Sequence, residues 1–257
     1  MGLGKAMRWV LLERYYPPMT PILLPGLLCD ASVWQDMLPA LQRRWPCVVP
    51  DYGALDSIEA MAQHVLQTAP HGPLALAGHS MGGRVALEIL RQQPERIQRL
   101  ALMDTGFEAL ALGAAGEKER AGRMALLQTA RQDGMRAMGR DWARGMVHPS
   151  RLDSPLFDRI LDMIERSTPE IFEAQIHALL HRPDAAALLG QIRCPTLLLC
   201  GREDAWSPLA RHAQMRSLLG AAPVELVVIE HAGHMSPMEQ PDAVCQAMQH
   251  WLDGNPA

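Results

Sequence analysis

The segment 78–82, GHSMG, places a serine between small residues. It follows the apolar run 74–77 and precedes residues with helical periodicity, which predicts a strand, a sharp turn and a helix. In such a turn the residues two before and two after the serine must be small, because larger side chains would collide with nearby backbone. The turn would present Ser80 as a nucleophile at the carboxyl edge of a sheet. A glycine-rich turn without chemistry is the alternative.

A serine hydroxyl needs a general base to remove its proton, and His234 is the candidate that we select. It lies in the loop 231–235, HAGHM, directly after the predicted strand Val224–Ile229. His231 stands closer to the end of that strand, so we interpret it as structural. His79 adjoins the serine too closely to accept its proton and is expected to pack or hydrogen bond behind the turn.

The histidine in turn needs an acid that fixes its tautomer and stabilises its charged form. Asp204 follows the predicted strand 196–200 and keeps the chain order Ser, Asp, His. Asp104, which ends the strand after the serine's helix, is the competitor. We favour Asp204, because its loop is expected to neighbour the loop of the histidine. A helix cap or a surface charge is the alternative role for either acid.

Two backbone N–H groups must face the negative charge that develops on a carbonyl oxygen under attack. Met81, the residue after the nucleophile, is expected to supply one of them. The other is expected from Leu27, in the loop after the first buried strand, where Gly26 lets the backbone pass close to a substrate. These two residues form the predicted oxyanion hole.

Apolar runs alternate with helical patterns along most of the chain, which is typical of a mostly parallel sheet with helices on both faces. The alternation stops between residues 107 and 189, where the pattern is helical and no strand is convincing. We therefore predict a doubly wound α/β core from residues 1–106 and 190–257, with 107–189 inserted as a helical cap. The predicted strands are 21–25, 47–50, 74–77, 100–103, 196–200 and 224–229, and the predicted core helices are 33–42, 58–68, 82–93, 208–219 and 242–252.

The predicted cap is rich in methionine, whose flexible side chain adapts to irregular apolar ligands. Met135, Met138, Trp142 and Met146 are therefore candidate lining residues of a substrate pocket. Packing of cap helices on the core is the alternative for each of them. Arg136, Arg140 and Arg144 recur every fourth residue and would attract a carboxylate, although such a row is more often a solvated helix face.

Composition excludes several classes of partner. A formal net charge of −4 gives no basic surface for nucleic acid, and no apolar segment is long enough to span a membrane. The N-terminal segment lacks the unbroken apolar stretch of a signal peptide. Five scattered cysteines without a CxxC pair predict reduced thiols in a cytoplasmic protein. His177 and His181 have the spacing of a metal pair on a helix, but no third ligand is evident, so we predict no metal and no cofactor.

Four segments follow one another in the order of a known family: LPG at 24–26, GHSMGG at 78–83, GRED at 201–204 and GHMSPMEQP at 233–241. On these residues the chain resembles the α/β-hydrolase superfamily, in the branch of small bacterial esterases and lactonases with a helical cap. The resemblance covers nearly the whole chain and implies the same three catalytic residues and oxyanion donors. Pro25 replaces a histidine that is common in the family, and the loop 51–57 is shorter than usual.

The predicted reaction is hydrolysis of a carboxylic ester of a small, largely apolar substrate through an acyl-enzyme. His79 before the nucleophile resembles the ester-cleaving members of the family and favours esters. Lactones, thioesters, amides and carbon–carbon bonds are alternatives on the same scaffold. A small-molecule receptor with residual turnover and a degenerate binding protein are alternatives of another class. A small molecule is the only partner predicted, and the sequence does not predict the oligomeric state.

Overall fold

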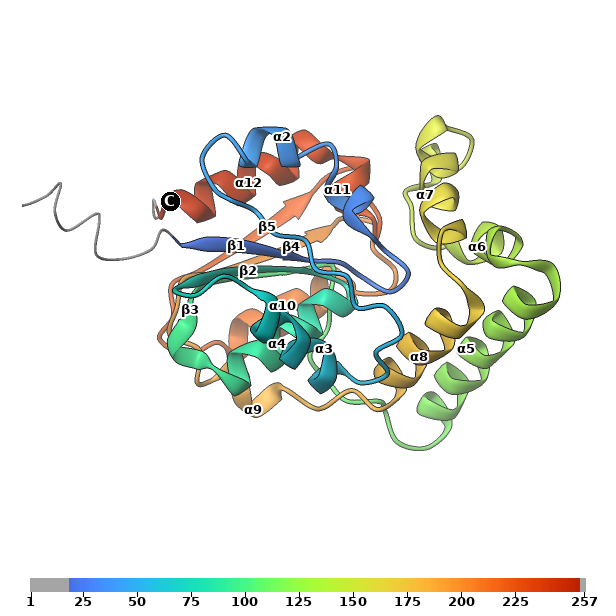
Figure 1. Ribbon diagram of the computed structural model, residues 1–257, viewed down its shortest axis with the longest axis horizontal. Coiled ribbons are helices and arrows are strands. Elements are labelled where there is room, and N and C mark those ends of the chain that lie inside the picture. The colour runs from blue at the N-terminus through green and yellow to red at the C-terminus, as the bar shows by residue number, and fades with distance from the viewer. Residues whose placement is uncertain (1–18, 255–257) are drawn as a thin grey trace, which may run out of the picture.

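The computed structural model describes residues 19–254, in which five parallel strands form one sheet (Figure 1). Their order across the sheet is the same as their order along the chain. The strands are β1 (Thr20–Leu24), β2 (Leu74–His79), β3 (Ile97–Met103), β4 (Thr196–Gly201) and β5 (Val224–Ile229). Because all of them run the same way, their carboxyl ends meet at one edge of the sheet.

Helices cover both faces of the sheet, which is why the strands read as continuous apolar runs. Every residue of β1, β2 and β4 is buried, whereas β5, at the edge, is mostly half-buried. On one face lie α2 (Leu38–Leu41) and α12 (Pro241–Asp253); on the other lie α3 (Ile58–Thr68), α4 (Met81–Gln92) and α10 (Leu209–Leu218) (Figure 1). The observed architecture is therefore the predicted doubly wound α/β fold.

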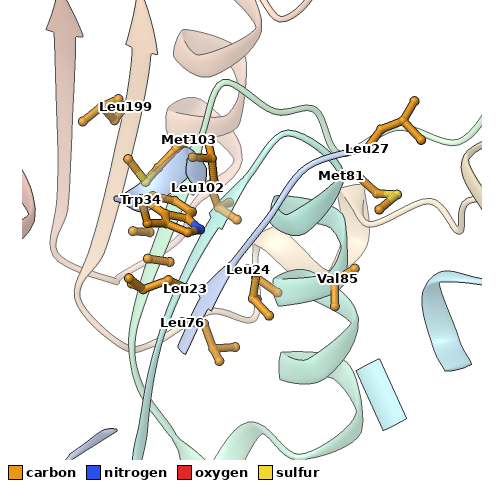
Figure 2. Packing of buried hydrophobic residues seen from close by; sticks show 14 of the residues in the cluster. Leu23, Leu24, Leu27, Trp34, Leu76, Met81, Val85, Leu102, Met103 and Leu199 are labelled. Atoms are coloured by element: carbon orange, nitrogen blue, oxygen red, sulfur yellow. The ribbon is translucent and has the colours of Figure 1, made fainter. Parts of the chain in front are cut away.

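Consecutive residues of a strand point to opposite faces and so contribute to two packing layers. Leu23 and Leu24 of β1 illustrate this (Figure 2). Leu24 points toward α4 and Val85, whereas Leu23 lies on the side of Trp34, and all four side chains are buried. Removing such a side chain would leave a cavity in a core that both helix layers share.

Between β3 and β4 the described chain contains helices and no strand. Four of these helices gather beyond the carboxyl edge of the sheet (Figure 1). They are α5 (Ala114–Asp133), α6 (Met135–Ala143), α7 (Pro155–Glu165) and α8 (Pro169–Leu180). A fifth, α9 (Ala186–Leu189), packs against α10 of the core. The insertion thus stands where a parallel α/β sheet binds its ligands.

Two predicted core elements are wrong. The predicted helix 33–42 is a 3₁₀ turn, Ala31–Trp34, followed by the single-turn helix α2, which begins with Pro39 in its first turn. The predicted strand 47–50 is reduced to one bridge between Val48 and Ile22. Pro46 and Pro50 flank that bridge, and a proline has no N–H to continue a ladder.

The sequence also yields predictions about membrane spans, cysteines and a signal peptide, and the described residues bear on the first two. No helix among residues 19–254 is both long enough and apolar enough to cross a bilayer. All five cysteines are free. The prediction about a signal peptide concerns residues 1–18, which lie outside the described part of the chain.

The turn between β2 and α4 depends on two glycines that admit no side chain. A Cβ on Gly78 would stand 2.3 Å from the carbonyl oxygen of Gly82, and a Cβ on Gly82 would stand 2.1 Å from the carbonyl oxygen of Leu24. Real Cβ atoms do not approach backbone this closely, so both positions must be glycine. These contacts bring the start of α4 against the end of β1.

Glu239, in the short helix α11 (Ser236–Glu239), joins the insertion to the core. Its carboxylate accepts hydrogen bonds from the backbone N–H groups of Gly233, Met235 and His148, at 2.9, 3.2 and 2.7 Å. Burial raises the pKa of Glu239 to about 7, although all three N–H groups favour the ionised form. One carboxylate therefore holds a core loop and the end of the insertion together.

We predict that Gly82→Ala lowers the free energy of unfolding by about 2–4 kcal/mol, because the new methyl group must displace the backbone of β1. Gly122→Ala is the matched control. A Cβ at Gly122, in α5, meets nothing within 4 Å, so this change should raise stability by up to about 1 kcal/mol through helix propensity. Urea unfolding of both variants measures the contrast, and equal stabilities would contradict the packing described.

We predict that the free energy of unfolding of wild type, minus that of Glu239→Gln, falls as the pH rises from 4.5 to 7. The unfolded chain releases the Glu239 proton near pH 4.5, whereas the folded chain keeps it up to about pH 7, so unfolding releases a proton in this window. The relative change is at most about 3 kcal/mol, since one pKa unit corresponds to about 1.4 kcal/mol. Urea unfolding at several pH values measures it.

The exposed Glu59 in α3 supplies the control. The difference in the free energy of unfolding between wild type and Glu59→Gln should stay constant from pH 4.5 to 7. A difference between wild type and Glu239→Gln that stays constant with pH, or changes in the opposite direction, would contradict the pKa assigned to Glu239.

Candidate active site

Ser80 has the strained backbone that a sharp strand-to-helix turn imposes. Its φ of 54° and ψ of −116° lie in a region that residues with side chains rarely adopt. Neighbouring backbone holds it there: the Ser80 N–H donates to the Met103 carbonyl at 2.9 Å, and the Thr105 hydroxyl donates to the Ser80 carbonyl at 2.6 Å. Sequence reasoning missed Thr105, whose role no motif indicates.

The side chains of Ser80 and His234 are hydrogen-bonded. Ser80 Oγ lies 2.8 Å from His234 Nε2, on a buried imidazole. The backbone of the histidine is fixed from two sides, since its N–H donates to the Met146 carbonyl and its carbonyl accepts from His79 Nε2 at 2.8 Å. His79, at the end of β2, and Met146, in the insertion, therefore both hold the backbone that carries the imidazole.

Asp204 completes a chain of hydrogen bonds that begins at Ser80. Its Oδ2 lies 2.9 Å from His234 Nδ1, while its Oδ1 accepts from the N–H groups of Trp206 and Ser207 at 2.8 and 2.9 Å. Burial alone would raise the pKa of Asp204, but His234 and these two N–H groups outweigh it and hold the pKa below its usual value. An ionised Asp204 fixes the proton of His234 on Nδ1 and leaves Nε2 free to accept the serine proton.

Asp104, the competing acid, lies nearby but has other partners. It is fully buried and hydrogen-bonded to the Ser236 hydroxyl, and its Oδ1 accepts from the Gly201 N–H at 2.8 Å. Burial, followed by the charge of Asp204, raises the pKa of Asp104 well above its usual value. A neutral Asp104 serves as a structural hydrogen-bonding group beneath the site.

His79 lies behind the turn, as predicted. Because the His234 carbonyl can only accept, His79 Nε2 carries the proton that makes this hydrogen bond. Burial, and then the charge of His234, lowers the pKa of His79 to about 3. The imidazole is therefore neutral over the whole range of pH at which proteins normally work. His231 is exposed and packs edge-on against His148.

The backbone at Leu27 and Met81 converges at Ser80. A Cβ on the preceding Gly26 would stand 3.1 Å from the Cβ of Ser80, so the loop after β1 lies against Ser80. Figure 2 shows Leu27 and Met81 together at the carboxyl edge of the sheet. Within residues 19–254, neither the Leu27 N–H nor the Met81 N–H donates a hydrogen bond to another protein group. Both N–H groups are thus available to a ligand.

A cavity of about 1070 Å³ opens between the sheet edge and the insertion, and both Ser80 and His234 line it. Of the four lining residues predicted in the insertion, Trp142 and Met146 line the cavity. Met135 and Met138 do not, which corrects the prediction for these two. They are buried in the first part of α6, which contacts α5 and α7, whereas Trp142 near the end of α6 stacks on Trp206 of the core.

Aromatic side chains form the wall next to His234. The Trp206 ring stacks on Trp142 with 5.5 Å between centroids and lies 5.0 Å from the His234 ring, and Phe172 packs 5.9 Å from Trp142. Sequence reasoning missed Trp206, although its place just after Asp204 is a signal that could have found it. This wall suits an apolar portion of a ligand.

The predicted arginine row does not reach the cavity. Arg140 and Arg144 are exposed, and Arg136 pairs on the surface with Asp162 and Glu165. The row is the solvated face that we gave as the alternative interpretation. The cavity instead has basic residues from other elements, which no sequence pattern indicated.

His177 in α8 and His181 just after it are exposed, and their rings lie tilted to each other with 4.1 Å between centroids. His177 Nδ1 bonds the Asp56 carbonyl at 2.9 Å. In the described part of the chain, no three histidine, cysteine or acidic residues form a group that could hold a metal ion.

Comparisons with known proteins agree with this fold. Pimeloyl-[acyl-carrier protein] methyl ester esterase of Nitrosomonas europaea is 27% identical over 241 residues, covering 86% of this chain and 90% of that protein. A 2-hydroxy-6-oxononadienedioate/2-hydroxy-6-oxononatrienedioate hydrolase of Escherichia coli is 26% identical over 268 residues, covering 91% of this chain and 86% of that protein.

Among solved structures, a thermophilic esterase from Thermogutta terrifontis, with malate bound, has a TM-score of 0.81 and 27% identity, covering 94% of this chain and 92% of its own. A family model described as the alpha/beta hydrolase family matches residues 22–247, which is most of the chain. The protein therefore belongs to the alpha/beta hydrolase family.

Proposed function

We propose that this protein is a serine hydrolase that cleaves carboxylic esters of small, largely apolar substrates through an acyl-enzyme. Ser80 is the nucleophile, His234 the general base and Asp204 the acid that orients it. The observation that carries the proposal is the continuous chain of hydrogen bonds from Ser80 Oγ through both nitrogens of His234 to Asp204 Oδ2, at 2.8 and 2.9 Å. This arrangement is suited to making a serine hydroxyl nucleophilic near neutral pH.

In the first half-reaction, Ser80 Oγ attacks the ester carbonyl while His234 Nε2 takes the hydroxyl proton. The carbonyl oxygen becomes an oxyanion, which the N–H groups of Leu27 and Met81 stabilise. Collapse of the tetrahedral intermediate breaks the bond to the alcohol, which leaves with the proton held by His234. In the second half, water loses a proton to the same imidazole and attacks the acyl-enzyme, so the acid is released and Ser80 regains its proton.

Electrostatics at the site support these roles. Asp204 is ionised and faces His234, so it stabilises the imidazolium that forms in each half-reaction. His79 remains neutral and adds no positive charge beside that imidazolium. The aromatic wall of Trp142, Trp206 and Phe172 supports an apolar acyl or alcohol group. Two of the relatives reported above are named as esterases, which favours esters among the possible acyl substrates.

We predict that Ser80→Ala and His234→Ala each lower kcat for p-nitrophenyl butyrate by about 10⁴-fold or more, because either change removes the activated nucleophile. Release of p-nitrophenol, with thermal melting as a check on folding, measures the loss. Hydrolysis that survives in folded Ser80→Ala would contradict the mechanism. Tight ester binding with negligible turnover in wild type would favour the small-molecule receptor.

We predict that Asp204→Asn lowers kcat by about 10³–10⁴-fold, because an amide no longer fixes the tautomer of His234. Asp104→Asn is the matched control and should cost less than about tenfold. In the structure the Gly201 N–H donates to Asp104 Oδ1 and the Ser236 hydroxyl donates to Oδ2. An asparagine keeps the acceptor for Gly201, and its amide N–H can donate to the Ser236 oxygen once that hydroxyl rotates. The reverse order of effects would assign Asp104 as the acid.

A further inference from the structure

The cavity that contains Ser80 also contains an excess of positive charge. Five cationic and two acidic side chains line it, and they come from both the core and the insertion. The cations are Arg84, Lys118, Arg123, Arg182 and Arg211, and the acids are Glu108 and Glu119. Neither the aromatic wall nor the proposed mechanism uses these groups.

Glu119 pairs with two of the three cations that the insertion supplies, Arg123 and Arg182, and leaves Lys118 unpaired by it. Both of its oxygens accept from the Arg182 guanidinium, at 2.8 and 2.9 Å, and Arg123 also donates to Oε1 at 2.9 Å. Although burial opposes ionisation, these two arginines hold the pKa of Glu119 at about 2. Arg123 and Arg182 are therefore engaged by a carboxylate that remains ionised.

Arg84 and Arg211, from the core, are less well compensated. Arg211 Nε lies 3.6 Å from Glu108 Oε2, and its Nη1 donates to the Trp206 carbonyl at 2.8 Å. Arg84 Nη1 donates to the Glu108 carbonyl at 2.8 Å, but no carboxylate among residues 19–254 forms an ion pair with it. Burial is the main cause that lowers the pKa of Arg84 to about 9, and the charge of Arg182 adds to it.

The two core arginines converge above a glycine. A Cβ on Gly106 would stand 2.9 Å from Arg84 Nη2 and 3.5 Å from Arg211 Nε, so both guanidinium groups border the same point on the cavity wall. The Glu108 carboxylate is near Arg211 and the Glu108 carbonyl accepts from Arg84, so two cations share one anion and one positive charge is left over. A bound carboxylate would accept charge-assisted hydrogen bonds from both and relieve their repulsion.

Arg84 and Arg211 line the same cavity as Ser80. Arg84 follows Ser80 by about one turn of α4, and Arg211 Nη1 donates to the carbonyl of Trp206, whose ring lies beside His234. One ligand can therefore place an ester at Ser80, a short apolar segment along the aromatic wall and an acid group at the arginines.

We propose that Arg84 and Arg211 bind a free carboxylate of the substrate, so that the substrates are small esters carrying a carboxylate a few carbons from the ester bond. The proposal rests on ester hydrolysis at Ser80 and adds a charged specificity group to it. Arg84 and Arg211 bind and orient the substrate and take no part in proton transfer.

The test compares half esters with their neutral diesters: monomethyl and dimethyl succinate, glutarate and adipate. We expect kcat/KM of wild type for the best half ester to exceed that for its diester by about 10–100-fold at low ionic strength, the range for charge-assisted hydrogen bonds. This preference should fall at least tenfold in Arg84→Gln and in Arg211→Gln. Arg44→Gln, which changes a surface arginine paired with Asp253, should keep it.

Binding to Ser80→Ala, measured by calorimetry, tests recognition without turnover. The half ester should bind at least tenfold more tightly than the diester, and adding Arg84→Gln or Arg211→Gln should remove the difference. Thermal melting checks that each variant folds. Because Arg84→Gln and Arg211→Gln are tested separately, the experiment remains decisive if one of them does not fold. Equal binding of half ester and diester, or a preference that survives in both variants, overturns the proposal.

The outcomes also separate this proposal from the proposed function. Hydrolysis of diesters that depends on Ser80, without preference for half esters, overturns the carboxylate site and leaves the hydrolase intact. Preferential binding of half esters that depends on both arginines, without any hydrolysis by wild type, overturns the esterase and supports the carboxylate site.

Discussion

The contact between the end of β1 and the start of α4 constrains the rest of the site. Because Gly78 and Gly82 carry no side chains, the two backbones approach closely and the chain turns sharply at Ser80. The turn forces Ser80 to a φ of 54°, and hydrogen bonds from Ser80 to Met103 and from Thr105 to Ser80 keep it there. The Ser80 hydroxyl is thereby held in place without a ligand, which is the preorganisation that the proposed mechanism needs.

The histidine loop depends on both the core and the insertion. Met146 and His148, just after α6, contact the loop through the His234 N–H and through Glu239. Stacking of Trp142 on Trp206 adds a second connection between the two parts. Substitutions at the end of α6 are therefore expected to affect the position of the base as well as the shape of the pocket.

The sequence could predict those parts of the fold and site that local patterns encode. Buried parallel strands read as apolar runs, and the GHSMG segment predicts its turn because only small residues fit there. Asp204 and His234 follow from the order of the strands, since each lies in a loop after a strand at the same edge. Val48 shows the limit: its apolar run resembles a strand, but flanking prolines reduce it to a single bridge.

Residues whose roles depend on long-range contacts could not be predicted from a motif. Thr105 belongs to no motif and reaches the Ser80 carbonyl only because β2 and β3 pair. Trp206 follows Asp204 closely, but its contacts with Trp142 and His234 depend on the folded chain. Met138 and Trp142 share a helix face, so periodicity treats them alike, but only the end of α6 near the core meets the cavity. Arg84 and Arg211 lie far apart in sequence and converge only because Gly106 leaves room between them.

The proposed mechanism requires Ser80 to be a nucleophile activated by His234. Covalent labelling with a fluorophosphonate probe, followed by peptide mapping, examines this requirement, because the probe reacts with an activated serine and does not require the natural substrate. We expect a single adduct on Ser80 in wild type and none in His234→Ala. An unlabelled Ser80 in folded wild-type protein, or an adduct on another residue, would contradict it.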